Sequence, residues 1–178
     1  MDRGLNRSEN EEIVYGVKEV KNIVCLVEAE IPSNTGNIAR TCVTTDTALH
    51  LVRPLGFQLT DKYLKRAGMD YWQDLDLTIW DTFDLFIDFL EEEAKKGCEI
   101  IYATTKGKKT LADVQVTKPS LLIFGKESAG LPEDFLFKHI ERCYRIPMAK
   151  GKRSLNLANS VAIMLYEVLR QQGFPHLY

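Results

Sequence analysis

The sequence lacks any long apolar stretch, and this excludes one large class of protein. Within its 178 residues, each run of apolar side chains is far shorter than a membrane-spanning helix, which needs roughly 18 or more. Met1 is followed by Asp2, Arg3 and further polar residues, without the apolar segment of a signal peptide. We therefore expect a cytoplasmic protein that has no contact with a membrane.

Cysteine and histidine are also scarce. The four cysteines, Cys25, Cys42, Cys98 and Cys143, form no Cys-x-x-Cys pair, and three of them sit in apolar runs. With only three histidines in the chain, no recognisable spacing of metal ligands is present. We expect reduced thiols in the core and no metal site.

Several familiar catalytic motifs are missing. No Gly-x-Gly-x-x-Gly follows an apparent strand, and there is no Gly-Lys-Ser/Thr phosphate loop and no Gly-x-Ser-x-Gly elbow. These absences argue against NAD-dependent hydride transfer, phosphate-loop chemistry and serine hydrolysis.

Charge is nearly balanced overall but unevenly distributed. The net charge is −2, which excludes a uniformly basic protein, yet residues 74–99 alone hold nine acids and two bases. Outside that segment 21 bases face 16 acids, with clusters at 62–66, 106–109 and 150–153. Each cluster alone could be a solvated turn. Together, with an acidic helix elsewhere, they favour one basic face that binds a polyanion.

Short apolar runs alternate with helical patterns along most of the chain. The runs predict strands at 23–27, 49–52, 75–80, 100–103 and 121–124, with a weaker one at 143–146. The clearest helix is 82–96, with Asp81 as its cap and Gly97 at its end. This alternation predicts an α/β fold whose mainly parallel sheet is flanked by helices. Residues 1–21 are polar and predict a flexible extension, which leaves a domain over 22–178.

The last predicted helix, 155–169, is apolar on nearly all sides. Such a helix must be buried all round. One side can pack on the sheet, and the other is covered either by the same chain or by a second copy. We favour a homodimer.

Three polar segments follow apparent strands. In 31–40, Asn34 suits a helix N-cap and Arg40 lies about two turns further on, although a capped surface helix is an alternative. In 123–132, Gly125 and Gly130 frame a charged turn whose backbone amides could meet a ligand.

The third segment, 145–160, runs from a proline-ended strand through a basic glycine turn into a helix. Ser154 suits the helix cap, and Asn156 and Asn159 lie three residues apart, on one side of that helix. Polar residues at such a position are usually caps, but two amides beside Arg153 and Ser154 favour a site.

The order of these segments resembles the SPOUT methyltransferases, specifically the SpoU-type RNA 2′-O-ribose methyltransferases. The matching motifs are 34–40, 124–132 and 146–159, and the resemblance extends over about 22–175. It is closest to the branch that methylates cytidine or uridine at the first anticodon nucleotide of tRNA. Segments 53–57, 61–71 and 104–107 also resemble that branch.

The resemblance implies a fold, a cofactor and partners. It implies an α/β fold with a deep C-terminal trefoil knot, a homodimer, a tRNA anticodon stem-loop as substrate and S-adenosylmethionine as cofactor. The cofactor residues implied by position are Ala103, Thr104, Thr105, Gly125, Glu127, Gly130, Ile146, Pro147, Met148, Ser154 and Leu155.

The resemblance also implies catalytic roles. Arg40 matches an arginine that arranges the target ribose and phosphate; it stays protonated, so it is not a free base. Asn34, Glu127, Ser154 and Asn156 match residues that hold this arrangement, and Tyr166 matches a tyrosine near the target but could equally be core. The candidate RNA contacts are Arg40, Lys65, Arg66, Lys106 and Arg153.

Two positions depart from the pattern, and two other functions stay open. Lys126 stands where proline is common in this branch, and Ala158 where serine is common. The alternatives are a SpoU-type enzyme for another tRNA position or ribosomal RNA, and a catalytically silent protein that binds RNA or S-adenosylmethionine. The complete set of motif residues argues against the silent protein.

Overall fold

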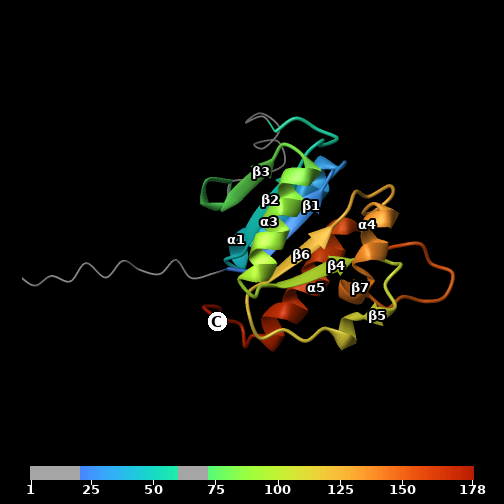
Figure 1. Ribbon diagram of the computed structural model, residues 1–178. Helices are drawn as coiled ribbons and strands as arrows, with labels where there is room; N and C mark the ends of the chain where they lie inside the picture. The colour runs from blue at the N-terminus through green and yellow to red at the C-terminus, as the bar shows by residue number, and fades with distance from the viewer. Residues whose placement is uncertain (1–20, 60–71) are drawn as a thin grey trace, which may run out of the picture.

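Seven parallel strands form the centre of the molecule, in the order β3-β2-β1-β6-β4-β7-β5 (Figure 1). The computed structural model describes residues 21–59 and 72–178. The strands are β1 (Ile23–Val27), β2 (Ala48–Val52), β3 (Leu77–Trp80), β4 (Glu99–Ala103), β5 (Lys109–Thr110), β6 (Ser120–Phe124) and β7 (Cys143–Arg145). Every pairing between these strands is parallel.

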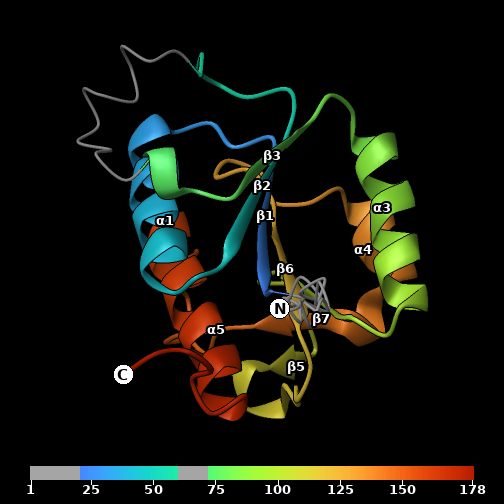
Figure 2. The ribbon, with the colours of Figure 1, turned by 90° about the vertical axis from the view of Figure 1, so that its left-hand side faces the viewer.

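Helices cover both faces of the sheet. They are α1 (Pro32–Thr44), α3 (Phe83–Lys95), α4 (Glu133–Lys138) and α5 (Leu157–Gln171), with short 3-10 turns at Trp72–Asp74, Leu111–Asp113 and Ile140–Arg142. Figure 2 shows α1 and α5 on one side of the sheet and α3 and α4 on the other. The predicted α/β fold with a parallel sheet flanked by helices is confirmed.

The central strands are apolar on both faces because each face packs on helices. In β1, Val24 and Leu26 belong to the core shared with α1 and α5, whereas Cys25 and Val27 face the core under α3 and α4. All four side chains are buried. This alternation follows from the two-residue period of a strand.

Several local expectations need correction. Thr82, not Asp81, caps α3: its hydroxyl accepts a hydrogen bond from the backbone N–H of Leu85 at 3.3 Å. Gly97 follows the helix with a φ of +89°, a left-handed conformation that suits glycine. The strand expected at 75–80 begins at 77, while β5 and α4 are too short to have a sequence pattern of their own.

The four cysteines are free, as expected, and three of them are buried. Among residues 21–59 and 72–178, no helix has the length and apolar character to cross a bilayer. In the same residues, no group of three or more His, Cys, Asp or Glu side chains is placed to hold a metal ion. Residues 1–20 of the predicted extension (1–21) and two predicted RNA contacts, Lys65 and Arg66, lie outside the described residues.

One buried histidine sits between the sheet and α3. His50 in β2 accepts a hydrogen bond at Nδ1 from the indole N–H of Trp80 at 3.2 Å, and it packs against Phe89. Burial lowers the pKa of His50 to about 4, against weaker opposing effects of Asp76 and Glu93. The folded protein therefore holds this imidazole neutral.

We expect His50 to make the folded state less stable in mild acid. Because its pKa is lowered on folding, the unfolded chain takes up a proton below about pH 6.5, and stability falls as the pH drops toward 4. Between pH 7 and pH 5 this contribution amounts to about 2 kcal/mol. Urea unfolding of wild type and His50→Gln at both pH values should show the smaller loss in the variant. Equal losses in the two proteins would contradict this.

Candidate active site

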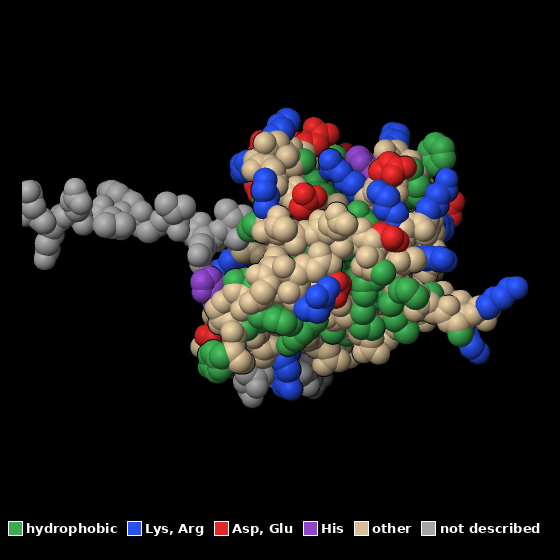
Figure 3. Space-filling view, turned by 90° about the horizontal axis from the view of Figure 1, so that it is seen from below, with side chains coloured by type: hydrophobic (Ala, Val, Ile, Leu, Met, Phe, Trp, Pro, Cys, Tyr) green, Lys and Arg blue, Asp and Glu red, His purple; other side chains and the backbone are tan. Residues whose placement is uncertain are grey.

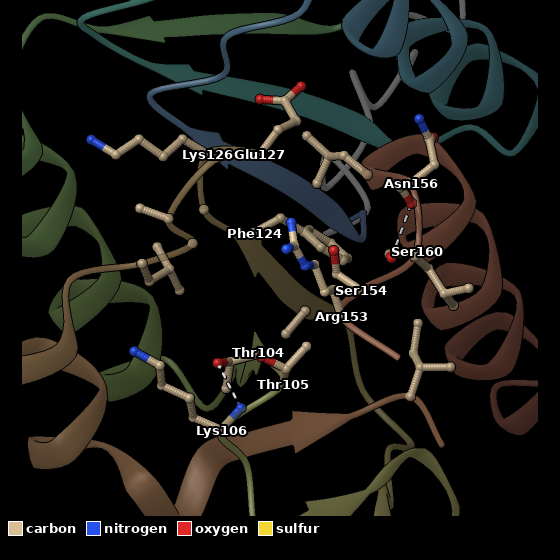
Figure 4. Close-up of a pocket in the computed structure, with 18 of the residues that line it drawn as sticks. Thr104, Thr105, Lys106, Phe124, Lys126, Glu127, Arg153, Ser154, Asn156 and Ser160 are labelled. Atoms are coloured by element: carbon tan, nitrogen blue, oxygen red, sulfur yellow. Dashed lines mark hydrogen bonds between the residues drawn. The ribbon is translucent and has the colours of Figure 1, made fainter. Parts of the chain in front are cut away.

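A cavity of about 530 Å³ opens where several strands of the sheet reach their carboxyl ends. Its walls come from the segment after β4, the loop after β6 and the segment between β7 and α5, with Ile31 and Asn34 contributed by the start of α1. Parallel α/β sheets bind ligands at this edge. Figure 4 shows Glu127 and Asn156 on one side of the cavity and Thr104 and Lys106 opposite them.

Glu127 joins two of the three polar segments. Its carboxylate accepts hydrogen bonds from the backbone N–H of Glu30 at 2.8 Å and of Ile31 at 3.3 Å. It also accepts one from the side-chain amide of Asn34 at 2.9 Å. Both carboxylate oxygens are used, so the loop after β6 is fixed to the loop after β1 in distance and in direction.

Asn34 and Asn156 extend this network to the third segment. The side-chain N–H of Asn156 donates to Oδ1 of Asn34 at 2.9 Å. The side-chain oxygen Oδ1 of Asn156 accepts from the backbone N–H groups of Ala158 and Asn159, at 2.9 and 3.3 Å. Three of the predicted site residues therefore form one hydrogen-bonded chain.

The two helix caps expected here are wrong. α1 begins at Pro32, two residues before Asn34, with no side-chain cap, because the amide of Asn34 is engaged by Glu127 and Asn156. At α5 the cap is Asn156 and not Ser154. The Ser154 side chain lines the cavity instead (Figure 4).

Gly125 and Gly130 close the turn after β6. A Cβ on Gly125 would lie 2.1 Å from the carbonyl carbon of Gly130, which no neighbouring backbone can accommodate. Gly130 has a φ of +74°, and its N–H donates to the carbonyl of Lys126 at 2.8 Å. The turn is therefore too tight for any side chain at position 125.

Most of the predicted cofactor residues surround this cavity. Those that line it are Ala103, Thr104, Thr105, Gly125, Glu127, Gly130, Ile146, Met148, Ser154 and Leu155. Pro147 is not among the lining residues, although both its neighbours are. Two predicted RNA contacts, Lys106 and Arg153, also line the cavity, and Lys106 forms an ion pair with Glu133 at the start of α4.

Two predicted catalytic residues lie elsewhere. Arg40 is an exposed residue of α1, and Tyr166 is 49% exposed on α5; neither lines the cavity. The ring of Tyr166 lies 6.5 Å from that of Phe174, centroid to centroid.

Sequence reasoning missed contacts behind the loop after β6. Glu30 accepts hydrogen bonds from Ser128, and the ammonium of Lys126 lies 2.7 Å from the carboxylate of Glu28. Hydrogen bonding to Glu28 raises the pKa of Lys126. The only signal in the sequence was the charge of these residues beside two recognised motifs.

A model of the SpoU rRNA Methylase family matches residues 21–166. The chain belongs to this family. A protein of Listeria monocytogenes is 49% identical over 159 residues, which cover 88% of this chain and 91% of that protein. A protein of Aeromonas hydrophila named tRNA (cytidine(34)-2′-O)-methyltransferase is 42% identical over 152 residues, covering 85% and 94% of the two chains.

Solved structures of family members share the fold. One, described as giving insight into the 2-OH methylation of C/U34 on tRNA, has a TM-score of 0.78 and 39% identity and covers 86% of this chain and 97% of that one. An AdoMet-bound rRNA methyltransferase from Sinorhizobium meliloti has a TM-score of 0.72 and 28% identity, covering 86% and 57%.

We expect Asn156 to stabilise the start of α5 through its side-chain oxygen Oδ1. Asn156→Ala removes the cap and should lower the free energy of unfolding by about 1 kcal/mol, whereas Asn156→Asp keeps a capping oxygen and should lose less. The control is Asn159→Ala, an exposed neighbour in the same helix turn, expected within about 0.5 kcal/mol of wild type. Urea unfolding at neutral pH measures all three. An equal loss in Asn156→Ala and Asn159→Ala would contradict the capping role.

Proposed function

We propose that this protein is an S-adenosylmethionine-dependent tRNA methyltransferase that modifies the ribose 2′-hydroxyl of cytidine or uridine at the first anticodon nucleotide. The observation that carries the proposal is the chain of hydrogen bonds from Glu127 through Asn34 to Asn156, which brings three motifs together beside one cavity. The chain also belongs to a family of RNA methylases, with close relatives named for this reaction.

The cavity suits S-adenosylmethionine in size and in chemistry. Its volume lies in the range typical of small-molecule sites. Ile146, Met148 and Leu155 offer apolar surface for an adenine ring, while Thr104 and Ser154 offer hydroxyl groups for polar atoms. We propose that the segment after β4, the turn after β6 and the segment before α5 hold this cofactor.

The bound cofactor supplies an activated methyl group on a sulfonium. In the reaction the ribose 2′-oxygen forms a bond to the methyl carbon, the carbon–sulfur bond breaks with its electrons going to sulfur, and the hydroxyl proton is lost. The nucleophile is weakly acidic and must lie in line with the methyl group. Orientation by the protein therefore has to supply much of the rate.

We propose that Arg40 provides part of this orientation. Its guanidinium stays charged and can hold a phosphate and the neighbouring ribose, but it does not remove the proton. Asn34 lies six residues earlier on α1, and its amide is fixed by Glu127 and Asn156. The helix thereby connects the RNA-binding arginine to the wall of the cavity.

The proposed RNA surface includes the basic segment before α5. Lys150, Lys152 and Arg153 are all exposed, and Arg153 also lines the cavity. The segment projects from the body of the molecule (Figure 1), and Figure 3 shows Lys or Arg side chains at the tip of this projection. Such contacts to phosphates position RNA without reading its sequence.

We further propose that the enzyme is a homodimer that uses the outer side of α5. In one chain Ile163 and Tyr166 are 40% and 49% exposed, and Leu155 just before the helix and Ile31 beside the cavity are also partly exposed. Hydrophobic side chains gather on the lower face, where α5 ends (Figure 3). A second copy would cover this surface and bring Tyr166 near a site.

Two finer features rest on family membership. We propose that the segments around β6 and β7 form the deep trefoil knot of the SPOUT fold. Because the proposed substrate is tRNA, we also propose that the enzyme works in the cytoplasm.

The proposed reaction predicts a defined product. Incubation with labelled S-adenosylmethionine and unmodified bulk tRNA, followed by mass spectrometry of anticodon fragments, should show 2′-O-methylcytidine or 2′-O-methyluridine at the first anticodon nucleotide. A mark at another tRNA position or on ribosomal RNA would favour the first alternative. No transfer to either RNA would favour a protein that only binds.

Arg40→Ala should separate catalysis from cofactor binding. Because Arg40 does not line the cavity, we expect the rate of methyl transfer to fall about 100-fold or more and the Kd for S-adenosylhomocysteine to change little. Isothermal titration and single-turnover kinetics measure the two effects. Arg142→Ala, which removes an exposed arginine outside the cavity, is the control and should retain the wild-type rate. A large loss of cofactor affinity in Arg40→Ala would show that its role is different.

A further inference from the structure

Glu30 lies in none of the three motifs and does not line the cavity, yet its side chain contacts a residue that does. One carboxylate oxygen of Glu30 accepts the backbone N–H of Ser128, and the other accepts the hydroxyl of Ser128, each at 2.8 Å. Both hydrogen bonds lower the pKa of Glu30, and the one from the Ser128 hydroxyl has the larger effect. Ser128 lines the cavity, but Glu30 does not. Glu30 therefore holds the cavity loop from outside.

The contact between these two loops is reciprocal. Glu127 accepts hydrogen bonds from the backbone of Glu30 and Ile31, while Glu30 accepts two from Ser128. Each loop thus contributes one carboxylate to the other, and both carboxylates use both oxygens. Two such contacts fix the relative position of the loops more completely than either could alone.

A third segment supports Glu30 from behind. The N–H of Gly56 donates to the carbonyl of Ala29 at 2.9 Å. A Cβ on Gly56 would lie 2.7 Å from Cα and the carbonyl oxygen of Glu30, so the two backbones are in close contact. Glu30 is therefore fixed through its main chain as well as through its side chain.

We propose that Glu30 is a positioning residue for methyl transfer, which it promotes by fixing the loop 125–130 relative to the start of α1. This inference rests on the proposed function. The loop 125–130 carries cofactor-lining residues, and α1 carries Asn34 and Arg40 for the RNA side. The two reacting groups are thus held by different segments, and the Glu30–Ser128 contact sets the spacing between them.

Glu30 should affect rate more than folding or binding. Its bonds to Ser128 lie at the surface, where water competes for the same groups, so their net contribution to stability is small. When the Glu30–Ser128 contact is lost, the cofactor and the tRNA each keep the residues that bind them, so their affinities change little. Their alignment with each other does change, and a displacement of about 1 Å can reduce a rate about 100-fold.

The test compares Glu30→Gln with wild type in the same assays. We expect the single-turnover rate at saturating cofactor and tRNA to fall about 10-fold to 100-fold, and the Kd values for S-adenosylhomocysteine and tRNA to change by less than about threefold. Without any ligand, hydrogen exchange at the amides of 126–130 should become faster, because the Ser128 N–H loses its charged acceptor.

Matched variants separate positioning from general damage. Glu28→Gln removes a charge from the same loop, but its partner is the flexible side chain of Lys126, so a rate within about twofold of wild type is expected. Ser128→Ala should lower the rate, and by less in the Glu30→Gln background because the two residues act on one contact.

Three outcomes would overturn the inference. They are a wild-type rate in Glu30→Gln, unchanged hydrogen exchange at 126–130, and a rate loss that weakened cofactor binding fully accounts for. Absence of methyl transfer by the wild-type protein itself would instead contradict the proposed function. The hydrogen-exchange comparison would still test whether Glu30 holds the loop 125–130 in place.

Discussion

The carboxylate of Glu127 is the interaction on which the site depends. It fixes the end of β6 to the start of α1 through three donors, one of them the amide of Asn34, a residue 93 positions away along the chain. Asn34 in turn accepts from Asn156, which caps the start of α5. The parallel sheet brings three loops to one edge, but these polar contacts give the cavity its shape. A charged acceptor with both oxygens engaged defines direction as well as distance.

The strands β1, β2, β4 and β6 could be predicted because each is a short, mostly apolar run that is largely buried. The helix caps could not, since capping depends on where a side chain finds its partner. Asn34 has the chemistry of an N-cap, yet its amide is taken by residues far away in sequence. Asp81 and Thr82 are both suitable caps by type, and only the backbone geometry selects Thr82. The strand β5 has only two residues, too few to show the two-residue alternation of a strand in the sequence.

The site was predictable in part for a related reason. Glycine turns and polar residues directly after strands mark the edge where ligands bind, and most of the residues so marked do line the cavity. Arg40 does not line the cavity. It lies six residues after Asn34, which is one full helical turn and about 240° more, so it faces away from the side of α1 that carries Asn34. Glu30 was missed because its side chain contacts Ser128, on a loop that no local sequence pattern connects to residue 30.

The hydrogen-bonded chain from Glu127 to Asn156 also determines when the cavity can exist during synthesis. A nascent chain made as far as the loop after β6 already contains both Glu127 and Asn34, but it lacks Asn156 and all of α5. The buried face of α5, which includes Val161, Leu165 and Val168, covers one side of the sheet. A ribosome must therefore deliver nearly the whole domain before a binding site forms. Ligand binding can stabilise only the completed fold, not the growing chain.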